Sequence, residues 1–369
     1  MKAAVLYEVG KKLEIIDLNI GKPKHGEVLV NMKAAGVCAS DHHVIHGQIP
    51  YPTPIVLGHE NAGIVEEIGE NVEGIEPGDS VIMSFVSSCG NCFYCRTGLA
   101  NHCSRHYSDP KVQHKLFDNT FRIHDQEDTG IFQMNKLGGF AEKQVVPADS
   151  LLVIPNEVPP EVAALIGCCV TTGFGGIVNL DNIKTGSTVA VFGCGGVGLN
   201  ILEGAKSLNA NKIIAVDISD HKLEFAYKFG ATHVINAKNE DPVEKISEAT
   251  GGVMADLVVD LSSAPQVPGL CLDLVRYGGD VIWAGLKDRQ AVPVVTDTAV
   301  MRGITIHGGA GGTNRSLRKA VEILNRKEFP TSLLLGEVFS INEIDDAMAV
   351  LNRTSHNDAV RAVLSHNRK

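Results

Sequence analysis

One short segment of this 369-residue chain, from Cys38 to Glu60, concentrates side chains that bind metal ions. Cysteine thiolates and histidine imidazoles are typical zinc ligands, and a catalytic zinc takes three protein ligands and keeps one position open. Cys38 and His59 would provide two ligands, and Cys168 in LIGCCVTTGFG is the best candidate for the third. The alternative is that Cys38 is a small buried hydrophobic side chain and His59 a hydrogen-bonded loop residue. Between Cys38 and Glu60 the segment contains four further ionisable or metal-binding side chains, Asp41, His42, His43 and His46.

A second group of cysteines lies in CGNCFYCRTGLANHC. Its members are Cys89, Cys92 and Cys95, each separated by two residues, and Cys103, which follows after seven. Four thiolates on one short lobe predict a closed tetrahedral zinc site, which is structural because no position remains for a substrate. The alternatives are four unrelated thiols or an iron–sulfur cluster, which also takes four closely spaced cysteines.

A glycine-rich turn follows the apolar run STVAVFG. Gly193, Gly195 and Gly198 form the pattern G-x-G-x-x-G between a predicted strand and a predicted helix, and Asp217 ends the next predicted strand. This context predicts a dinucleotide site, with the pyrophosphate at the helix N-terminus. A carboxylate at Asp217 would accept hydrogen bonds from a ribose 2′-hydroxyl and repel a 2′-phosphate, which favours NAD over NADP. The alternative is a plain strand-to-helix turn with spare glycines.

The overall composition limits the class of protein. A formal net charge of -10 argues against a nucleic-acid partner, which needs a basic face. No segment approaches the roughly 18 consecutive apolar residues of a membrane span, and the start of the chain lacks a signal-peptide core. We therefore expect a cytoplasmic protein, in which closely spaced cysteines bind metals rather than form disulfides.

The pattern along the chain predicts two domains. Residues 1–36 and 61–87 alternate apolar and polar side chains, which indicates a β-rich first third with the zinc candidates on its loops. Residues 104–139 are polar and predict a long loop, with its histidines at the surface. A helix should begin after Pro159 or Pro160. From about residue 185, strands alternate with helices, which predicts a doubly wound parallel sheet.

These motifs together carry a family resemblance. Over nearly its whole length, the chain resembles the zinc-dependent medium-chain alcohol dehydrogenases. The motifs are Cys38-x-Ser40-Asp41, Gly58-His59-Glu60, the four-cysteine lobe, Ile166-Gly167-Cys168, and Gly193 to Gly198 with Asp217. The resemblance implies an α/β protein with a GroES-like, partly open β-barrel catalytic domain at residues 1–169 and 306–369, including the zinc lobe at 89–103. A Rossmann domain that binds NAD would be inserted at residues 170–305.

The resemblance also implies roles for individual residues and two zinc ions per chain. The catalytic zinc would be bound by Cys38, His59 and Cys168, with Cys169 as the competing third ligand. Asp41 and Glu60 would surround it, and Ser40 and His43 match a proton relay. The residues expected to bind NAD are Gly193, Gly195, Gly196, Val197, Gly198, Asp217, Thr172, Lys222 at the adenosine ribose and Arg361 at the pyrophosphate. The substrate pocket would include Phe85, Met134 and Asn135, for which simple packing is the alternative.

The expected reaction is reversible hydride transfer between a primary or aromatic alcohol and NAD, giving the aldehyde. One alternative is a thiol-adduct formaldehyde dehydrogenase, a branch that carries an arginine near the position of Tyr107; Arg105 lies close by. A zinc-ribbon binding module without catalysis is disfavoured by the acidic charge and the glycine turn. The small-molecule partner would be an alcohol or aldehyde. We also expect a homodimer, or a tetramer built from dimers, joined through an edge strand that includes RGITIH, residues 302–307.

Overall fold

The computed structural model describes residues 1–107, 110–178, 183–309, 311–312, 314–325, 331–351 and 361–368. The chain divides into two compact units, Met1–Thr171 with Gly312–Lys369, and Thr172–Gly311. Among the described residues, no helix is both long and apolar enough to cross a lipid bilayer.

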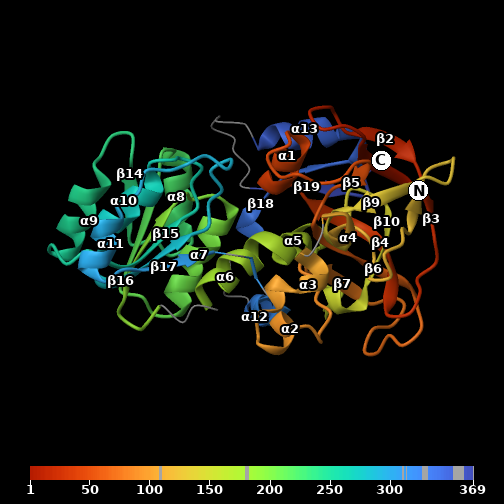
Figure 1. Cartoon of the computed structure of the whole chain (residues 1–369), viewed down its shortest axis with the longest axis horizontal. Coiled ribbons are helices and arrows are strands. Elements are labelled where there is room, and N and C mark those ends of the chain that lie inside the picture. Colours follow the sequence, from red (N-terminus) through yellow and green to blue (C-terminus); the bar gives the residue numbers. More distant parts are fainter. Residues whose placement is uncertain are drawn as a thin grey trace. The chain divides into compact units, whose positions relative to one another are not determined.

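The first unit contains two β-sheets (Figure 1). One has the strand order β2-β1-β5-β9-β8-β3, and the other has the order β11-β7-β6-β4-β19-β18, with β10 paired to β4. The strands are β1 Lys2–Leu6, β2 Glu14–Asp17, β3 Asn19–Ile20, β4 Glu27–Gly36, β5 Ile55–Val56, β6 Glu60–Ile68, β7 Ser80–Met83, β8 Ile123–His124, β9 Gly130–Gln133, β10 Lys143–Pro147, β11 Leu151–Ile154, β18 Leu335–Phe339 and β19 Arg361–Ser365. Strand β4 is the centre of the second sheet because it pairs with β6, β10 and β19.

Short helices connect these strands. They are α1 Ala39–Ile45, α2 Phe93–Arg96, α3 Ser104–Tyr107, α4 Pro110–Gln113, α5 Pro160–Leu165, α12 Asn314–Asn325 and α13 Ile344–Val350, with the tighter turns η1 Ala100–His102, η2 Met134–Lys136, η3 Ala148–Ser150, η5 Thr331–Leu334 and η6 Ile341–Glu343. One wider π-helical turn, η4 Ile166–Val170, follows α5 directly. Helix α5 begins at Pro160, as predicted, because a proline lacks the N–H that the first turn would leave unpaired.

The second unit is a parallel sheet with the strand order β14-β13-β12-β15-β16-β17. Its strands are β12 Thr188–Phe192, β13 Lys212–Asp217, β14 His233–Asn236, β15 Ala255–Asp260, β16 Val275–Trp283 and β17 Thr305–Gly308, and its helices are α6 Thr171–Val178, α7 Gly196–Ser207, α8 Asp220–Lys228, α9 Pro242–Thr250, α10 Val267–Leu274 and α11 Thr296–Arg302. The chain moves outward from β12 to β14 and then returns to β15. Right-handed crossovers therefore put α7 and α8 on one face and α9 and α10 on the other. This confirms the predicted doubly wound sheet, whose order reverses between β12 and β15.

The edge strand β17 differs in part from the prediction. It begins at Thr305, whereas Arg302 ends helix α11, because Gly303 adopts a left-handed conformation with φ 62 and stops the helix. The Arg302 guanidinium donates to the carbonyl oxygens of Leu272 and Val275 and does not lie on the strand. Strand β17 pairs with β16 and belongs to the second unit, so the expected boundary after residue 305 falls inside a strand.

The segment predicted as one long loop has regular structure in its described part. Strand β8 pairs with β3, and β9 pairs with β5, so both belong to the first sheet. These strands have two and four residues, which is too short for an alternating pattern to be recognised.

Candidate active site and metal centres

Three separate segments of the first unit bring metal-binding atoms together. Cys38 directly precedes helix α1, His59 and Glu60 stand at the start of β6, and Cys168 lies in the π-helical turn. One ligand atom from each of these four side chains lies within 4.8 Å of the others, and all four residues are buried. Two thiolates and one imidazole are a donor set that suits zinc. Cys38, His59 and Cys168 are the ligands that the sequence predicts.

Asp41 orients two of these donors. Its carboxylate oxygens accept hydrogen bonds from the backbone N–H of Cys38 (3.0 Å) and of Gly58 (3.1 Å), and its Oδ1 lies 3.3 Å from His59 Nδ1. Burial alone lowers the pKa of His59, but the nearby charges of Asp41 and Cys38 raise that pKa well above its usual value. A carboxylate on Nδ1 leaves the Nε2 atom of the imidazole for a metal ion.

The π-helical turn decides which of two adjacent cysteines joins the site. Cys168 belongs to the donor group, whereas the Cys169 thiol donates to the carbonyl oxygen of Leu165 at 3.2 Å. A hydrogen bond with Cys168 lowers the pKa of the Cys38 thiol well below its usual value, while the same bond and burial raise the pKa of Cys168. Gly167 permits this approach, because a Cβ there would collide with the carbonyl oxygen of Met83.

Glu60 and Arg361 form a buried ion pair beside the donors. The Arg361 guanidinium contacts Glu60 Oε2, and the two side chains are 8% and 0% exposed. Burial raises the pKa of Glu60 to about 7, even though the charge of Arg361 opposes that rise. Gly36 makes room for this carboxylate, because a Cβ at that position would overlap it. Arg361 therefore points to the candidate zinc site, and its expected contact with a pyrophosphate stays a prediction.

The second cysteine group forms a compact cluster on the lobe that carries α2. Cys92 Sγ lies 3.5 Å from Cys95 Sγ and 4.0 Å from Cys103 Sγ, and Cys89 joins the same group. A tetrahedral zinc with Zn–S bonds near 2.3 Å would separate its sulfurs by about 3.8 Å. The spacing of these four thiols fits a closed zinc site.

Two residues of the expected relay lie on or beside helix α1. Ser40 Oγ is 3.8 Å from Cys38 Sγ, next to the donor group. The ring nitrogen Nδ1 of His43 contacts Oε1 of Gln48, and His43 is half-buried. These positions allow the predicted relay but do not test it.

The three expected substrate-pocket residues lie in different environments. The edge of the Phe85 ring faces His59, with ring centres 5.9 Å apart, so Phe85 borders the donor group. Met134 is 2% exposed and packs in the core of the first sheet. Asn135 is 5% exposed, and its Oδ1 accepts hydrogen bonds from the side chains of Tyr51 and Gln113. Packing, the alternative that we weighed, describes Met134 and Asn135 better than a pocket does.

The glycine turn of the second unit has the geometry of a phosphate site. Gly193 has φ +95, a Cβ on Gly198 would overlap the carbonyl oxygen of Gly193, and a Cβ on Gly195 would meet no atom within 4 Å. Helix α7 starts directly after Gly195. Backbone N–H groups at that helix end are therefore available to an anion, with open space above Gly195.

Asp217 stands at the end of β13, beside this turn. Its carboxylate accepts backbone N–H bonds from Cys194 (2.8 Å), Ile218 (2.7 Å) and Ser219 (3.0 Å). A carboxylate can accept about four hydrogen bonds, so one position remains for a ribose hydroxyl. Among the other expected contacts, Lys222 is exposed on α8 and Thr172 is half-buried on α6.

Comparison with known proteins agrees with this combination of sites. Residues 24–156 match the model of the alcohol dehydrogenase GroES-like domain, and residues 196–326 match that of the zinc-binding dehydrogenases. Alcohol dehydrogenase B of Mycobacterium tuberculosis is 40% identical over 94% of this chain and 93% of its own length. The chain belongs to the zinc-dependent medium-chain alcohol dehydrogenase family. Its first unit is thus the GroES-like domain, a curled half-barrel, and its second unit is the Rossmann-like domain.

Other relatives of this dehydrogenase carry more specific names. An NDMA-dependent alcohol dehydrogenase of Amycolatopsis methanolica is 33% identical over 99% of this chain and 98% of its own. An S-(hydroxymethyl)glutathione dehydrogenase of Saccharomyces cerevisiae is 39% identical over 75% and 72%. Among solved structures, an alcohol dehydrogenase zinc-binding domain protein from Burkholderia ambifaria has a TM-score of 0.91, and benzyl alcohol dehydrogenase from Acinetobacter calcoaceticus has 0.88. Both are 29% identical, over 99% of this chain and 98% of theirs.

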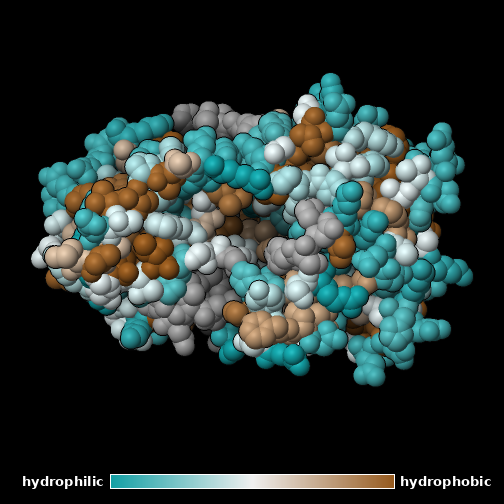
Figure 2. Space-filling view, in the orientation of Figure 1, coloured by the Kyte–Doolittle hydropathy of each residue, from teal (hydrophilic) through white to brown (hydrophobic). Residues whose placement is uncertain are grey.

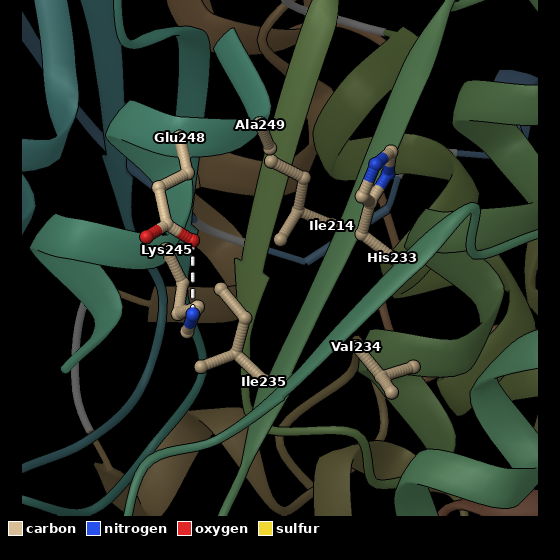
Figure 3. A pocket seen from close by; sticks show the side chains of 7 residues that line it. All are labelled: Ile214, His233, Val234, Ile235, Lys245, Glu248 and Ala249. Atoms are coloured by element: carbon tan, nitrogen blue, oxygen red, sulfur yellow. Dashed lines mark hydrogen bonds and ion pairs between the residues drawn. The ribbon is translucent and has the colours of Figure 1, made fainter. Parts of the chain in front are cut away.

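A surface pocket of the Rossmann-like unit lies apart from this chemistry. It has a volume of about 320 Å³, and Figure 3 shows its lining by side chains of β13, β14 and α9. Lys245 and Glu248, one helical turn apart on α9, form an ion pair at 2.9 Å on one side of the pocket. Its lining residues on β14 are His233, Val234 and Ile235, and none of its lining residues belongs to the glycine turn. The glycine turn follows the carboxyl end of β12, which is where cofactors bind in such sheets.

Sequence reasoning missed a buried histidine and a buried lysine beside α4, His114 and Lys136. His114, predicted at the surface, is fully buried, stacks on Tyr51 and accepts a hydrogen bond from the backbone N–H of Asn135 at 3.0 Å. Burial lowers the pKa of His114 to about 3, and the charge of Lys136 adds to the effect. Lys136 is also buried and donates to the carbonyl oxygens of Val112 and Gln113. No local pattern marks these residues, because their burial results from folding the segment onto the first sheet.

We predict two zinc ions per chain, one in each donor group. Cys168→Ser should remove the zinc bound by Cys38 and His59 and abolish activity, because serine is a poor ligand for zinc. Cys169→Ser is the matched control and should keep both ions, because its thiol bonds to Leu165. The measurement is zinc per chain by elemental analysis. Loss of zinc from the Cys169 variant alone would show that the third ligand is wrongly assigned.

We predict that His114 weakens the fold in acid. Between pH 6.5 and 3 the unfolded chain protonates this histidine and the folded chain does not, so stability falls as pH falls. Between pH 7.5 and pH 5 the loss is about 2 kcal/mol. His114→Gln should remove about that much of the pH dependence in denaturant titrations. The same substitution at exposed His25 should leave the pH dependence of the free energy of unfolding unchanged. If the His114 variant showed the same pH dependence as the wild type, the prediction would be contradicted.

Proposed function

We propose that this chain is an NAD-dependent zinc alcohol dehydrogenase that acts on primary or aromatic alcohols and returns the aldehyde. The observation that carries the proposal is the donor group of Cys38, His59 and Cys168, which joins two thiols and one imidazole in a buried site. A three-ligand zinc site leaves a position for substrate, whereas the four-cysteine lobe is closed. The benzyl alcohol dehydrogenase among the similar structures supports an aromatic substrate.

The proposed chemistry divides between the metal and the side chains around it. Zinc, when bound, supplies a Lewis acid that polarises the alcohol or aldehyde oxygen. Asp41 holds His59 in the orientation and tautomer that a metal requires. Arg361 balances the buried charge of Glu60, and the Phe85 ring borders the donors with an apolar surface. We assign proton movement to Ser40 and His43, because a hydroxyl and an imidazole can each accept and donate a proton.

A second candidate is oxidation of a formaldehyde–thiol adduct. It is supported by the Saccharomyces cerevisiae relative. In this chain, Arg105 Nη2 donates to the carbonyl oxygen of Phe117 at 2.7 Å, and its guanidinium lies over the Phe117 ring. An arginine that is held in this way is less available to bind a carboxylate of the thiol-containing substrate, so we rank this candidate second.

The experiment is a substrate panel followed by NADH absorbance. Benzyl alcohol and short primary alcohols should be oxidised with NAD alone. Adding glutathione to formaldehyde should not produce a new NAD-dependent activity. Activity that appears only with formaldehyde and glutathione together would favour the second candidate. Turnover that requires added NDMA, as the name of one relative states for that protein, would contradict the proposal that NAD alone is the electron acceptor.

We predict that Asp217 sets the preference for NAD. Removing its charge with Asp217→Asn should raise the relative catalytic efficiency with NADP by about tenfold or more, because a carboxylate repels a 2′-phosphate. Asparagine keeps one acceptor oxygen, which can still accept from the N–H groups of Ile218 and Ser219, and it loses only the acceptor of the Cys194 N–H. Zinc content is the control and should not change. A wild-type preference for NADP would contradict this assignment.

We propose a homodimer, with a tetramer of two dimers as the alternative. The supporting observation is the edge strand β17, where Ile306 is 38% exposed, together with Val300 and Met301 of α11, which are 76% and 80% exposed. Figure 2 shows apolar side chains gathered over this part of the second unit. Pairing of identical edges would cover them and close the assembly.

Light scattering should therefore give at least twice the 39.4 kDa mass of one chain. Val300→Asp should shift the protein toward the monomer, because it adds a charge to an apolar interface. Val253→Asp is the matched control, since Val253 is 63% exposed elsewhere on the same unit. A wild-type monomer at micromolar concentration would contradict the proposal.

We also propose a cytoplasmic location, which nine cysteines without a disulfide support.

A further inference from the structure

Helix α1 carries a second pair of donors on its surface, outside the two cysteine sites. His42 and His46 are four residues apart, and the backbone N–H of His46 donates to the carbonyl oxygen of His42 at 3.1 Å, which closes one helical turn. Residues at this spacing lie on the same face of a helix. The centres of the two imidazole rings are 4.0 Å apart. His42 is half-buried and His46 is exposed, so the pair is accessible from solvent.

The distance between the rings suits chelation of one ion. A metal lies about 2.0–2.1 Å from an imidazole nitrogen, and hence about 3.2 Å from the ring centre. When one nitrogen of each ring is turned toward a common ion, ring centres 4.0 Å apart subtend an angle of about 80° at the metal; the two ring planes are tilted by 42°. That angle is close to the 90° between neighbouring ligands in square-planar and octahedral sites. Two histidines four residues apart on a helix are also the zinc-binding element of the H-E-x-x-H motif.

The position on the helix favours a cation. His46 follows the last residue of α1, where carbonyl oxygens without helical partners give the helix a partial negative charge. His43 is the neighbouring residue, but its ring centre is 6.3 Å from that of His42 and its Nδ1 contacts Gln48. The pair therefore offers two nitrogen donors, and water would supply the remaining ligands.

We propose that His42 and His46 form a third metal site, a surface chelate for a divalent transition metal such as Ni²⁺, Cu²⁺ or Zn²⁺. The site is separate from the two cysteine-containing groups and does not depend on the proposed alcohol oxidation. With two protein ligands it binds and releases its ion more readily than a four-thiolate site. Nitrogen donors select Cu²⁺ and Ni²⁺ over Mg²⁺ and Ca²⁺, which prefer oxygen.

The test uses Ni²⁺ as the probe, because Cu²⁺ would oxidise the thiols. The full chain, without an affinity tag and with its own zinc in place, is titrated with NiCl₂ at pH 7.5 by calorimetry. We expect one Ni²⁺ per chain, with an affinity that His46→Ala and His42→Ala each lower by about tenfold or more, since the second donor is already held in place. The double variant should lose specific Ni²⁺ binding, because it keeps neither donor of the site.

The matched control is His221→Ala. His221 also has a ring partner four residues later on a helix, but that partner is Phe225, which cannot bind a metal. This variant should bind Ni²⁺ as the wild type does, and zinc measured before and after titration should be equal. Because His46 is exposed, His46→Ala tests the site even if His42→Ala disturbs the helix. Equal Ni²⁺ affinity of the wild type and His46→Ala would overturn the proposal, and so would a wild type that binds no Ni²⁺.

Discussion

The buried carboxylate of Asp41 is the constraint on which the candidate active site depends. It accepts hydrogen bonds from the backbone of Cys38 and Gly58 and lies next to the His59 ring. Those residues belong to the start of α1 and to the turn before β6, which are separate in the sequence. One fully buried charge therefore fixes two metal-binding side chains relative to each other. An unpaired carboxylate in this place would carry a large desolvation cost, so the three contacts are required for the fold as well as for the site.

The Glu60–Arg361 pair connects the end of the chain to the same site. Arg361 is the first residue of β19, which pairs with β4, and Gly36 at the end of β4 leaves the space that Glu60 fills. Removing one partner of a buried ion pair typically costs about 3–5 kcal/mol, because the other charge stays buried. The C-terminal part of the GroES-like unit thus contributes directly to the surroundings of the donors.

In the Rossmann-like unit the candidate cofactor site is formed mainly by backbone geometry, whereas the candidate metal sites of the first unit are formed by side chains. Gly193 turns the chain with a positive φ, and Gly198 lets α7 approach that turn more closely than any side chain would permit. Asp217 then ties the turn to the end of β13 through the N–H of Cys194. The same carboxylate that we propose to recognise the cofactor therefore also supports the turn that would bind its pyrophosphate. Structural and recognition roles at this residue cannot be separated by deletion alone.

The types of ligand, the four-cysteine lobe and the glycine turn with its acidic residue could be predicted from the sequence. These features are local, because a few residues of fixed spacing are enough to specify them. The choice between Cys168 and Cys169 depended on the fold, since the winding of the π-helical turn sets which thiol faces Cys38. The fold also placed Met134 and His114 in the interior. Burial and the direction of a side chain depend on contacts between distant segments, which spacing along the chain does not encode.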